Sequence, residues 1–256
     1  MQLSIIVPAY NEEKRLAQML AAYLPFFAAV YRNDFEIIVV VNGSSDATEN
    51  VARQYALKFP QLKCIVEPRP IGKGGAIMLG FARSKGAYTG FADADCSTPP
   101  EAFQDLVEKI GGADAIIASR WMKESQVSPP QAFSRRIASR VFNGLVRLFF
   151  GLRISDTQCG AKLLKQEAMR GILPFLGITR WAFDVDLLFQ LHRAGFTITE
   201  TPTVWHEMPG SRLKIARVSL EMFAAITRLR LLYSPFKGIV PFYDRHFARY
   251  SFGAHP

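Results

Sequence analysis

The sequence has 256 residues, of which 49% are hydrophobic and 21% are charged, and its formal net charge is +9. This length accommodates one sizeable core or two small ones, and the composition is typical of a globular protein rather than a disordered one. The positive charge favours anionic partners, namely phosphorylated substrates, an anionic membrane surface or nucleic acid, without choosing among them.

The three cysteines are Cys64, Cys96 and Cys159, and none has a partner at the spacing of a disulfide framework or a zinc site. A reducing, cytosolic setting fits this pattern best. The N-terminus opens on a strand-like run, Leu3 to Val7, and not on a cleavable signal. The uncharged stretch from Leu16 to Tyr31 is shorter than the roughly 20 apolar residues that span a bilayer. We expect a cytoplasmic protein, soluble or held peripherally on the cytoplasmic face of a membrane.

Short apolar runs alternate with amphipathic segments over the first 120 residues. Strands are predicted at Leu3–Val7, Phe35–Val41, Leu62–Glu67, Tyr88–Ala92 and Ala115–Ser119, and helices at Glu12–Val30, Ala47–Phe59, Gly75–Ser84 and Pro100–Ile110. This alternation indicates an α/β fold with a mostly parallel, Rossmann-like sheet flanked by helices. Ligands of such sheets bind at the carboxyl ends of the strands, so the loops after the strands should hold the chemistry.

Beyond Arg120 the pattern is more variable. Residues 122–132 are polar and contain two prolines, which is typical of a mobile loop. The other elements expected here are helices at Phe133–Phe149, Asp184–Ala194 and Lys214–Tyr233, and strands at Ala161–Leu164, Thr197–Glu200 and Thr203–His206. We expect a single domain over residues 1–235, with halves at 1–120 and 121–235, and a C-terminal tail at 236–256.

Asp93 and Asp95 stand two residues apart at the end of a predicted strand. Side chains i and i+2 share a face in an extended chain, so both carboxylates can point at one spot. A divalent cation, Mg²⁺ or Mn²⁺, is the natural occupant, held by the two acids together with substrate phosphates. The alternative is a solvated loop end, because Asp is common after strands.

Two other loops suit an anionic ligand. Gly72-Lys73-Gly74-Gly75 opens a predicted helix, and its glycines allow close backbone approach while Lys73 supplies positive charge. The motif lacks the Gly-Lys-Ser/Thr ending of a nucleotide-hydrolase phosphate loop, and an ordinary glycine turn remains the alternative. After the second strand, Asn42 or Asp46 can hydrogen-bond a nucleoside, although turn chemistry also explains this segment.

Taken together, these motifs resemble those of the family-2 glycosyltransferases over nearly the whole chain. The resemblance rests on Pro-Ala-Tyr-Asn-Glu at 8–12, Asn-Gly-Ser-Ser-Asp at 42–46, Gly-Lys-Gly-Gly-Ala at 72–76 and Asp-Ala-Asp at 93–95. In the second half, Asp-Thr-Gln-Cys-Gly at 156–160, Arg-Trp-Ala-Phe-Asp at 180–184, Trp-His-Glu at 205–207 and Gly-Ser-Arg-Leu at 210–213 are most similar to the dolichyl-phosphate β-glucosyltransferase group. The resemblance implies a GT-A fold and an inverting transfer of a hexose, glucose favoured, from a UDP-sugar to polyprenyl or dolichyl phosphate.

The resemblance also implies roles for individual residues. Mg²⁺ or Mn²⁺ would be held by Asp93 and Asp95, and the catalytic residues would be Asp95, Asp186 and Arg120. The nucleotide-sugar donor would be bound by Pro8, Tyr10, Glu12, Asn42, Asp46, Lys73, Asp93 and Arg212. The acceptor phosphate would contact Arg120, Arg135 and Ser139. Residues 1–120 would then form the donor-binding half and residues 121–235 the acceptor-binding half.

Several alternatives stay open at this point. Many family members have Asp-Asp or Asp-Asn where this chain has Val41-Asn42, so UDP is favoured by the resemblance alone. Transfer to a soluble hydroxyl acceptor would make Asp186 the general base, and a non-catalytic sugar-nucleotide-binding protein is disfavoured by the intact acid pair. No recognised nucleic-acid module is present. Basic and aromatic residues mix over 134–150 and 228–245, which suits an interfacial helix on anionic lipid, or else ordinary packing or a dimer surface.

Overall fold

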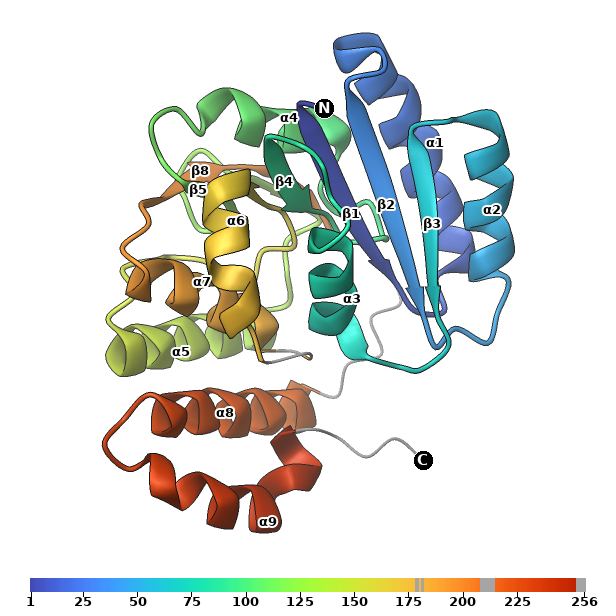
Figure 1. The fold of residues 1–256 in the computed structure, drawn as a ribbon. Helices are drawn as coiled ribbons and strands as arrows, with labels where there is room; N and C mark the ends of the chain where they lie inside the picture. Colours follow the sequence, from blue (N-terminus) through green and yellow to red (C-terminus); the bar gives the residue numbers. More distant parts are fainter. Residues whose placement is uncertain (178–179, 181, 208–214, 252–256) are drawn as a thin grey trace.

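The computed structural model describes residues 1–177, 180, 182–207 and 215–251, and it is built around a seven-stranded sheet with helices on both faces (Figure 1). The strands are β1 (Leu3–Ala9), β2 (Phe35–Asn42), β3 (Leu62–Glu67), β4 (Tyr88–Phe91), β5 (Ala115–Ser119), β7 (Lys162–Lys165) and β8 (Ile198–Pro202). They lie in the order β3-β2-β1-β4-β7-β5-β8, and all are parallel except β7, which is antiparallel to β4 and β5. The expected α/β fold with a mostly parallel sheet is confirmed.

The central strands are buried on both faces. β1 pairs with β2 in parallel from Leu3 opposite Phe35 to Ala9 opposite Val41, and every residue of β2 is buried. A strand covered on both faces has no solvent side, so its sequence is a continuous apolar run instead of an alternating one. This explains why Phe-Glu-Ile-Ile-Val-Val-Val-Asn forms a strand at the middle of the molecule.

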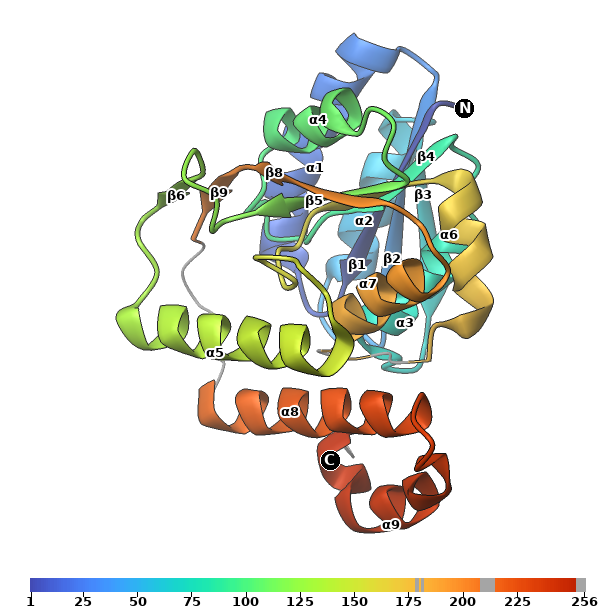
Figure 2. The same cartoon turned by 90° about the vertical axis from the view of Figure 1, so that its left-hand side faces the viewer.

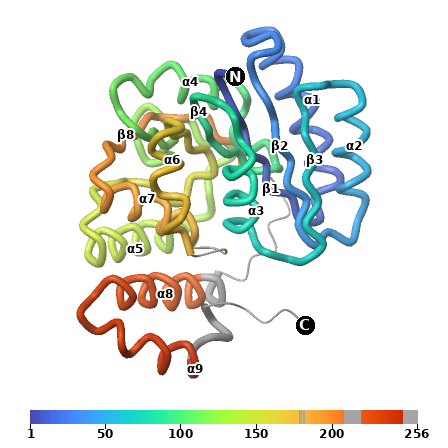
Figure 3. The backbone as a smooth tube through the Cα atoms, in the orientation of Figure 1, coloured from blue at the N-terminus to red at the C-terminus, as the bar shows by residue number. Residues whose placement is uncertain are grey.

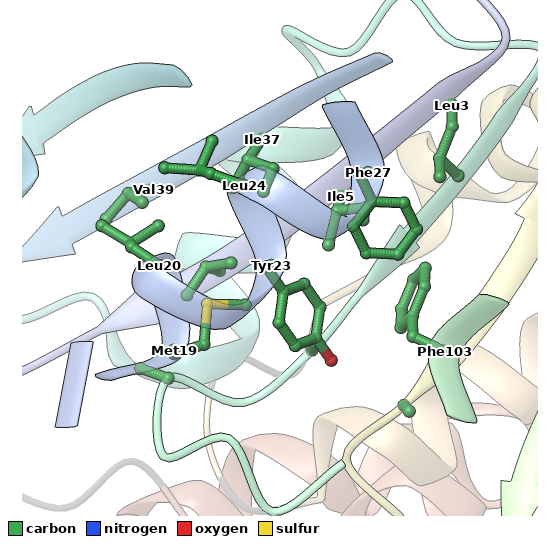
Figure 4. Close-up of a cluster of buried hydrophobic side chains, with 14 of the residues drawn as sticks. Leu3, Ile5, Met19, Leu20, Tyr23, Leu24, Phe27, Ile37, Val39 and Phe103 are labelled. Carbon is green, nitrogen blue, oxygen red and sulfur yellow. The ribbon is translucent and has the colours of Figure 1, made fainter. Parts of the chain in front are cut away.

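Helices α1 (Glu13–Tyr31), α2 (Thr48–Lys58) and α4 (Pro100–Lys109) cover one face of the sheet. Tyr23 and Phe27 of α1 point toward Phe103 of α4 in the core that Figure 4 shows, with ring centroids 6.3 and 6.1 Å from that of Phe103. The Tyr23 hydroxyl donates a hydrogen bond of 2.8 Å to the carbonyl of Thr98. This contact ties the core to the loop that follows the acid pair.

The opposite face is covered by α3 (Gly72–Phe81), α6 (Gln166–Ile172) and α7 (Phe183–Arg193), as Figures 1 and 2 show. A Cβ on Gly74 would lie 2.6 Å from atoms of Phe183, so the glycine allows α3 to approach α7 closely. The helix predicted at Gly75–Ser84 begins earlier, at Gly72, and ends at Phe81. The glycines expected to precede the helix form its first turn. A short 3₁₀ helix, η1 (Leu173–Phe175), follows α6.

The segment expected to be a mobile loop contains a strand. β6 (Gln126–Ser128) pairs in parallel with β9 (Val204–His206), which lies far away in the sequence. The backbone N–H of His206 also donates to the carbonyl of Ser97, at 2.8 Å. The expectation of a loop over 122–132 was wrong for the three residues of β6, because the partner strand of this polar segment is distant along the chain.

The C-terminal half adds α5 (Phe133–Phe150) and α8 (Ile215–Leu232) to the core beside α7, and α9 (Val240–Ser251) outside them. α5 packs its Phe150 ring 4.9 Å from that of Phe189, and α8 lies along α5. The stretch expected as a tail holds η2 (Lys237–Ile239) and α9, which folds back against α8 (Figures 2 and 3). In the described part of the chain, no helix has the length and apolar character needed to cross a bilayer.

Candidate active site

One edge of the sheet gathers the predicted site. The six parallel strands end there, and β7 begins there because it runs in the opposite direction. Phe91, the last residue of β4, pairs with Lys162, the first residue of β7. Asp93 therefore follows β4 at the edge where Gly160 leads into β7, and residues nearly 70 positions apart meet.

The two predicted metal ligands differ in their contacts. Asp93 Oδ1 lies 2.7 Å from the Nζ atom of Lys73. Asp95 Oδ1 accepts a hydrogen bond of 2.9 Å from the backbone N–H of Ser97. Cys96, the residue directly after Asp95, has a φ of 58°, in the left-handed region that non-glycine residues rarely adopt. Such local strain is typical of functional loops, and here it shapes the turn that holds Asp95.

Lys73 belongs to a row of alternating charges that runs from the protein interior to the sheet edge. Its Nζ lies 3.9 Å from Asp184 Oδ2, and the other oxygen of Asp184 forms an ion pair with Lys162. The Lys162 side chain is fully buried and also donates to the carbonyl of Cys159 at 2.7 Å. We call Lys162, Asp184, Lys73 and Asp93 the four-charge chain, since each member contacts the next.

Burial and neighbouring charges shift the pKa values of Asp93 and Lys73 in the four-charge chain. Burial raises the pKa of Asp93; the negative charge of Asp95 adds to the rise, and Lys73 opposes it. Burial acts to lower the pKa of Lys73, but the charges of Asp93 and Asp184 outweigh it and raise that pKa well above its ordinary value. Lys73 is therefore a permanent cation at neutral pH, and it is positioned to meet an anionic ligand.

The loops after β1 and β2 are joined by hydrogen bonds. Asp46 accepts from the backbone N–H of Glu13 at 3.2 Å and of Thr48 at 3.0 Å, so its carboxylate caps α1 and α2 together. Burial acts to raise the pKa of Asp46, but hydrogen bonds from the Thr48 hydroxyl and from these two backbone N–H groups outweigh it and lower that pKa. Asn42 is buried, and its side-chain amide donates to the carbonyl of Ala9 at 3.1 Å. Both residues hold the loops in place, which is the structural alternative raised by the sequence.

The first loop presents the remaining predicted nucleoside contacts. Pro8 lies in β1, and Tyr10, just beyond the strand, is 47% exposed. Glu12 forms an ion pair with Arg15 through two hydrogen bonds of 2.5 and 2.9 Å. Burial raises the pKa of Glu12, against the opposing effect of Arg15, and the charges of Asp95 and Asp93 raise it further.

Arg120 is held by a buried acid. Its Nε and Nη2 atoms donate to the two carboxylate oxygens of Asp156 at 2.7 and 2.9 Å, and its guanidinium stacks 4.9 Å from the Trp205 ring. Burial acts to raise the pKa of Asp156, but the Arg120 charge outweighs it and holds that pKa below its ordinary value. The pair fixes the loop that leads to Gly160 against the end of β5.

The other two predicted acceptor residues lie on α5. Arg135 forms an ion pair with Glu207, which also accepts a hydrogen bond of 2.9 Å from Gln131. Ser139 lies one turn further along, and its hydroxyl is buried without a hydrogen-bond partner in the part of the chain described here. Native buried hydroxyls are usually paired, so this one is suited to a ligand oxygen.

Asp186 lies in the first turn of α7 and is buried. Its carboxylate accepts hydrogen bonds from the backbone N–H of Gly177 at 2.8 Å and from Gln190 at 3.0 Å. Asp184, two residues earlier, is the acid of this helix that reaches Lys73. The predicted donor contact Arg212 lies outside the described residues.

The family model of glycosyl transferase family 2 matches residues 4–173. The chain belongs to glycosyl transferase family 2. It is 35% identical over 243 residues to dolichyl-phosphate beta-glucosyltransferase of Dictyostelium discoideum, covering 90% of this chain and 74% of that protein. It is 32% identical over 250 residues to the protein of the same name from Saccharomyces cerevisiae, covering 90% of this chain and 75% of that protein. The resemblance read from the motifs is confirmed.

Solved structures of glycosyltransferases share the fold. Glucosyl-3-phosphoglycerate synthase from Mycobacterium tuberculosis in complex with UDP superposes with a TM-score of 0.68 at 18% identity, covering 90% of this chain and 79% of that one. The same enzyme has been crystallised with Mn²⁺, UDP-glucose and phosphoglyceric acid, with a TM-score of 0.67 at 18% identity, covering 90% and 78%. At this identity the likeness concerns the fold alone, and the expected GT-A fold is confirmed.

For this family-2 glycosyltransferase, the structure brings Asp93, Asp95, Lys73 and Glu12 together at the sheet edge. It adds residues that the predicted site did not include, namely Lys162, Asp156, Gly160 and Glu207. Asp184 lies in the first turn of α7 beside the predicted catalytic residue Asp186, and it is Asp184 that contacts Lys73 and Lys162. A lysine inside an apolar strand, Ala161-Lys162-Leu163-Leu164, was the available signal for Lys162, because a lysine is almost never fully buried unless it is paired.

Proposed function

We propose that this chain transfers a hexose, with glucose favoured, from a UDP-sugar to polyprenyl or dolichyl phosphate with inversion at the sugar carbon. The supporting observation is the similarity, over 90% of the chain, to two proteins named dolichyl-phosphate beta-glucosyltransferase. The acid pair and Lys73 at the carboxyl edge of the sheet supply the groups that such a transfer needs. A lipid phosphate is already ionised near neutral pH, so alignment and charge stabilisation matter more than a general base.

The proposed metal site is Asp93 with Asp95, and the local structure fits Mg²⁺ or Mn²⁺. Both acids offer hard oxygen ligands, and the absence of a side chain at Gly160 gives the Asp93 carboxylate the space in which it lies. Among the residues described, no group of three or more His, Cys, Asp and Glu side chains is placed to hold an ion, so the other ligands would be donor phosphate oxygens and water. A cation held there would offset the charge that builds on the departing diphosphate.

The donor would lie across the loops that follow β1, β2 and β4. The exposed Tyr10 ring offers a surface for the base, and Pro8, Glu12, Asn42 and Asp46 set the shape of that pocket. Lys73 would pair with the diphosphate, since its charge persists at neutral pH. Arg212 is assigned to the diphosphate by the family resemblance alone.

The acceptor phosphate would bind beside α5. Arg135 and Ser139 lie one turn apart on the partly buried side of that helix and offer a charged and a neutral donor. Among the described residues, the Ser139 hydroxyl has no hydrogen-bond partner. The Arg120 guanidinium is already paired with Asp156, so we assign it mainly to holding this wall of the site. Catalytic roles are proposed for Asp95 as a metal ligand and for Asp186 as a residue that orients the acceptor side.

An outer stripe of α5 would contact the membrane. Phe133, Ile137, Val141 and Leu148 lie on one side of the helix and are 74, 48, 58 and 77% exposed. Exposed arginines border the stripe, at Arg136, Arg140 and Arg147. An apolar stripe flanked by basic residues suits an interfacial helix on anionic lipid. This arrangement would bring Arg135 and Ser139 to the headgroup level, at the cytoplasmic face that we propose.

The function is tested with purified protein, a panel of UDP- and GDP-sugars, polyprenyl phosphate, and Mg²⁺ or Mn²⁺. We expect glycolipid from UDP-glucose, its loss after EDTA, and its return after Mn²⁺ or Mg²⁺ is added in excess. Product formed only on a soluble sugar or polyol would contradict the proposed acceptor. Product formed equally well in EDTA would contradict the metal site.

A further inference from the structure

The four-charge chain crosses from the sheet to the proposed metal site with alternating sign. Lys162 and Asp184 are the buried end, with side chains 0 and 5% exposed, while Lys73 and Asp93 are 29 and 28% exposed. Both ammonium groups also lie over the Phe91 ring, 5.4 and 5.6 Å from its centroid. The buried pair is thus fixed in place, and the outer pair faces the site.

Lys73 is shared between two acids. Its Nζ is 2.7 Å from Asp93 and 3.9 Å from Asp184, so a small movement of one flexible side chain changes its main partner. A divalent cation on Asp93 would repel the ammonium group that now lies beside that carboxylate. Lys73 must then move, and Asp184 is the next negative charge that it already approaches.

Lys162 controls how strongly Asp184 attracts Lys73. One carboxylate oxygen of Asp184 is engaged by Lys162, which offsets its negative charge and leaves the other oxygen for Lys73. With Lys162 neutralised, Asp184 would draw Lys73 inward and away from Asp93. With Asp184 neutralised as well, Asp93 would be the remaining acid of the four-charge chain with which the Lys73 ammonium group could pair.

We propose that Lys162 is a positioning residue. Together with Asp184 it sets the fraction of molecules in which the Lys73 ammonium group pairs with Asp93. That fraction in turn sets the affinity of Asp93 and Asp95 for a divalent cation. Lys73 competes with the cation at Asp93 until it is drawn to Asp184 or to the donor diphosphate. This inference rests on the metal site of the proposed function. It assigns to a residue outside that site a measurable effect on cation binding.

The test measures Mn²⁺ binding in the absence of donor. Binding is detected as the loss of the free Mn²⁺ signal in electron paramagnetic resonance. We expect Lys162→Met to bind Mn²⁺ about tenfold more tightly than wild type, because Lys73 leaves Asp93. We expect the double variant Lys162→Met/Asp184→Asn to bind about tenfold more weakly, because Lys73 then stays on Asp93. Lys165→Met, on the same strand and partly exposed beside Asp114, is the matched control and should bind as wild type does.

Circular dichroism and a thermal melt establish that each variant is folded. Removing Lys162 alone leaves a buried acid with weaker compensation, which is destabilising. Should that variant not fold, Lys73→Met decides in its place, and it is expected to bind Mn²⁺ more tightly while the double variant binds more weakly. Shifts of equal sign, or none in either folded variant, would overturn the inference. Absence of binding by wild type, with and without UDP, would overturn the metal site itself and this inference with it.

Discussion

Gly160 lies against Asp93 so closely that a Cβ atom on the glycine would come 1.9 Å from the Oδ2 atom of the acid. The two residues are brought together because β7 runs antiparallel to β4 and starts at the edge where β4 ends. The glycine is therefore a packing requirement of the Asp93 carboxylate, which lies in the space that a side chain at position 160 would fill.

Gly160→Ala should abolish most transfer without unfolding the protein. The added methyl group would push the Asp93 carboxylate away, and a displacement of about 1 Å at a catalytic group costs about a hundredfold in rate. The measurement is kcat/KM for the donor, with a thermal melt on the same sample. Gly112→Ala is the control, because a Cβ there meets no atom within 4 Å, and equal activity in the two variants would contradict the proposed site.

Asp95→Asn separates the charge of Asp95 from its structural role. The amide oxygen can still accept the hydrogen bond from the Ser97 N–H, so the turn should persist. Without the negative charge, we expect kcat to fall by about 10² to 10³, the range seen when one charge-stabilising group is removed. Asp105→Asn, which alters an exposed pair with Lys109, is the control. Near-normal transfer by Asp95→Asn would count against a cation at this position.

The donor half was predictable because its chemistry follows directly after each strand. Asp93 and Asp95 come right after β4, and Lys73 opens a helix, so the sequence order alone puts them at one edge. The acceptor side was less predictable. Asp156 lies with Arg120 only because β7 enters the sheet in reverse between β4 and β5, and local sequence patterns carry no information on that choice of neighbours.

Two residue assignments illustrate the same limit. Asp184 and Asp186 both begin α7 and are indistinguishable by helix position, yet one reaches Lys73 and the other accepts from Gly177 and Gln190. Arg120 was expected to bind phosphate. Its pairing with the buried Asp156 could not be predicted from the sequence, because the two residues lie far apart along it. In both cases the deciding partner lies on another element.

Arg120→Met should destabilise the fold by about 3 to 5 kcal/mol, because it leaves Asp156 buried without its countercharge. The free energy of unfolding is measured by urea denaturation. Arg135→Met should cost less, since the side chains of Arg135 and its partner Glu207 are 37 and 20% exposed. Equal destabilisation by the two substitutions would contradict a structural role specific to Arg120.

The Arg120–Asp156 pair also predicts a pH dependence of stability. The folded pKa of Asp156 is lowered, so the unfolded chain takes up this proton first, and the stabilisation is present at neutral pH and lost as the pH falls below about 4. In Arg120→Met the pKa of the buried acid should rise instead, so acidification should relieve the destabilised variant. The difference in unfolding free energy between wild type and variant should therefore narrow from about pH 7 to about pH 4. A constant difference would contradict this electrostatic account.

The exposed stripe on α5 predicts membrane binding that depends on both apolar contact and charge. Phe133→Ser with Leu148→Ser removes the two most exposed apolar side chains of the helix, and each buried apolar side chain of this size contributes about 1.5 to 3 kcal/mol. In flotation assays, we expect wild type to rise with anionic liposomes at low salt, and the double variant to bind at least about tenfold more weakly. Leu57→Ser on α2, where the side chain is 88% exposed on a different part of the surface, is the control for loss of a surface apolar group.

Transfer to a short, water-soluble polyprenyl phosphate should be retained by the double variant, because Arg135 and Ser139 remain. Loss of that activity in a folded double variant would show that the stripe supports the site itself, and liposome binding equal to wild type would contradict the membrane contact.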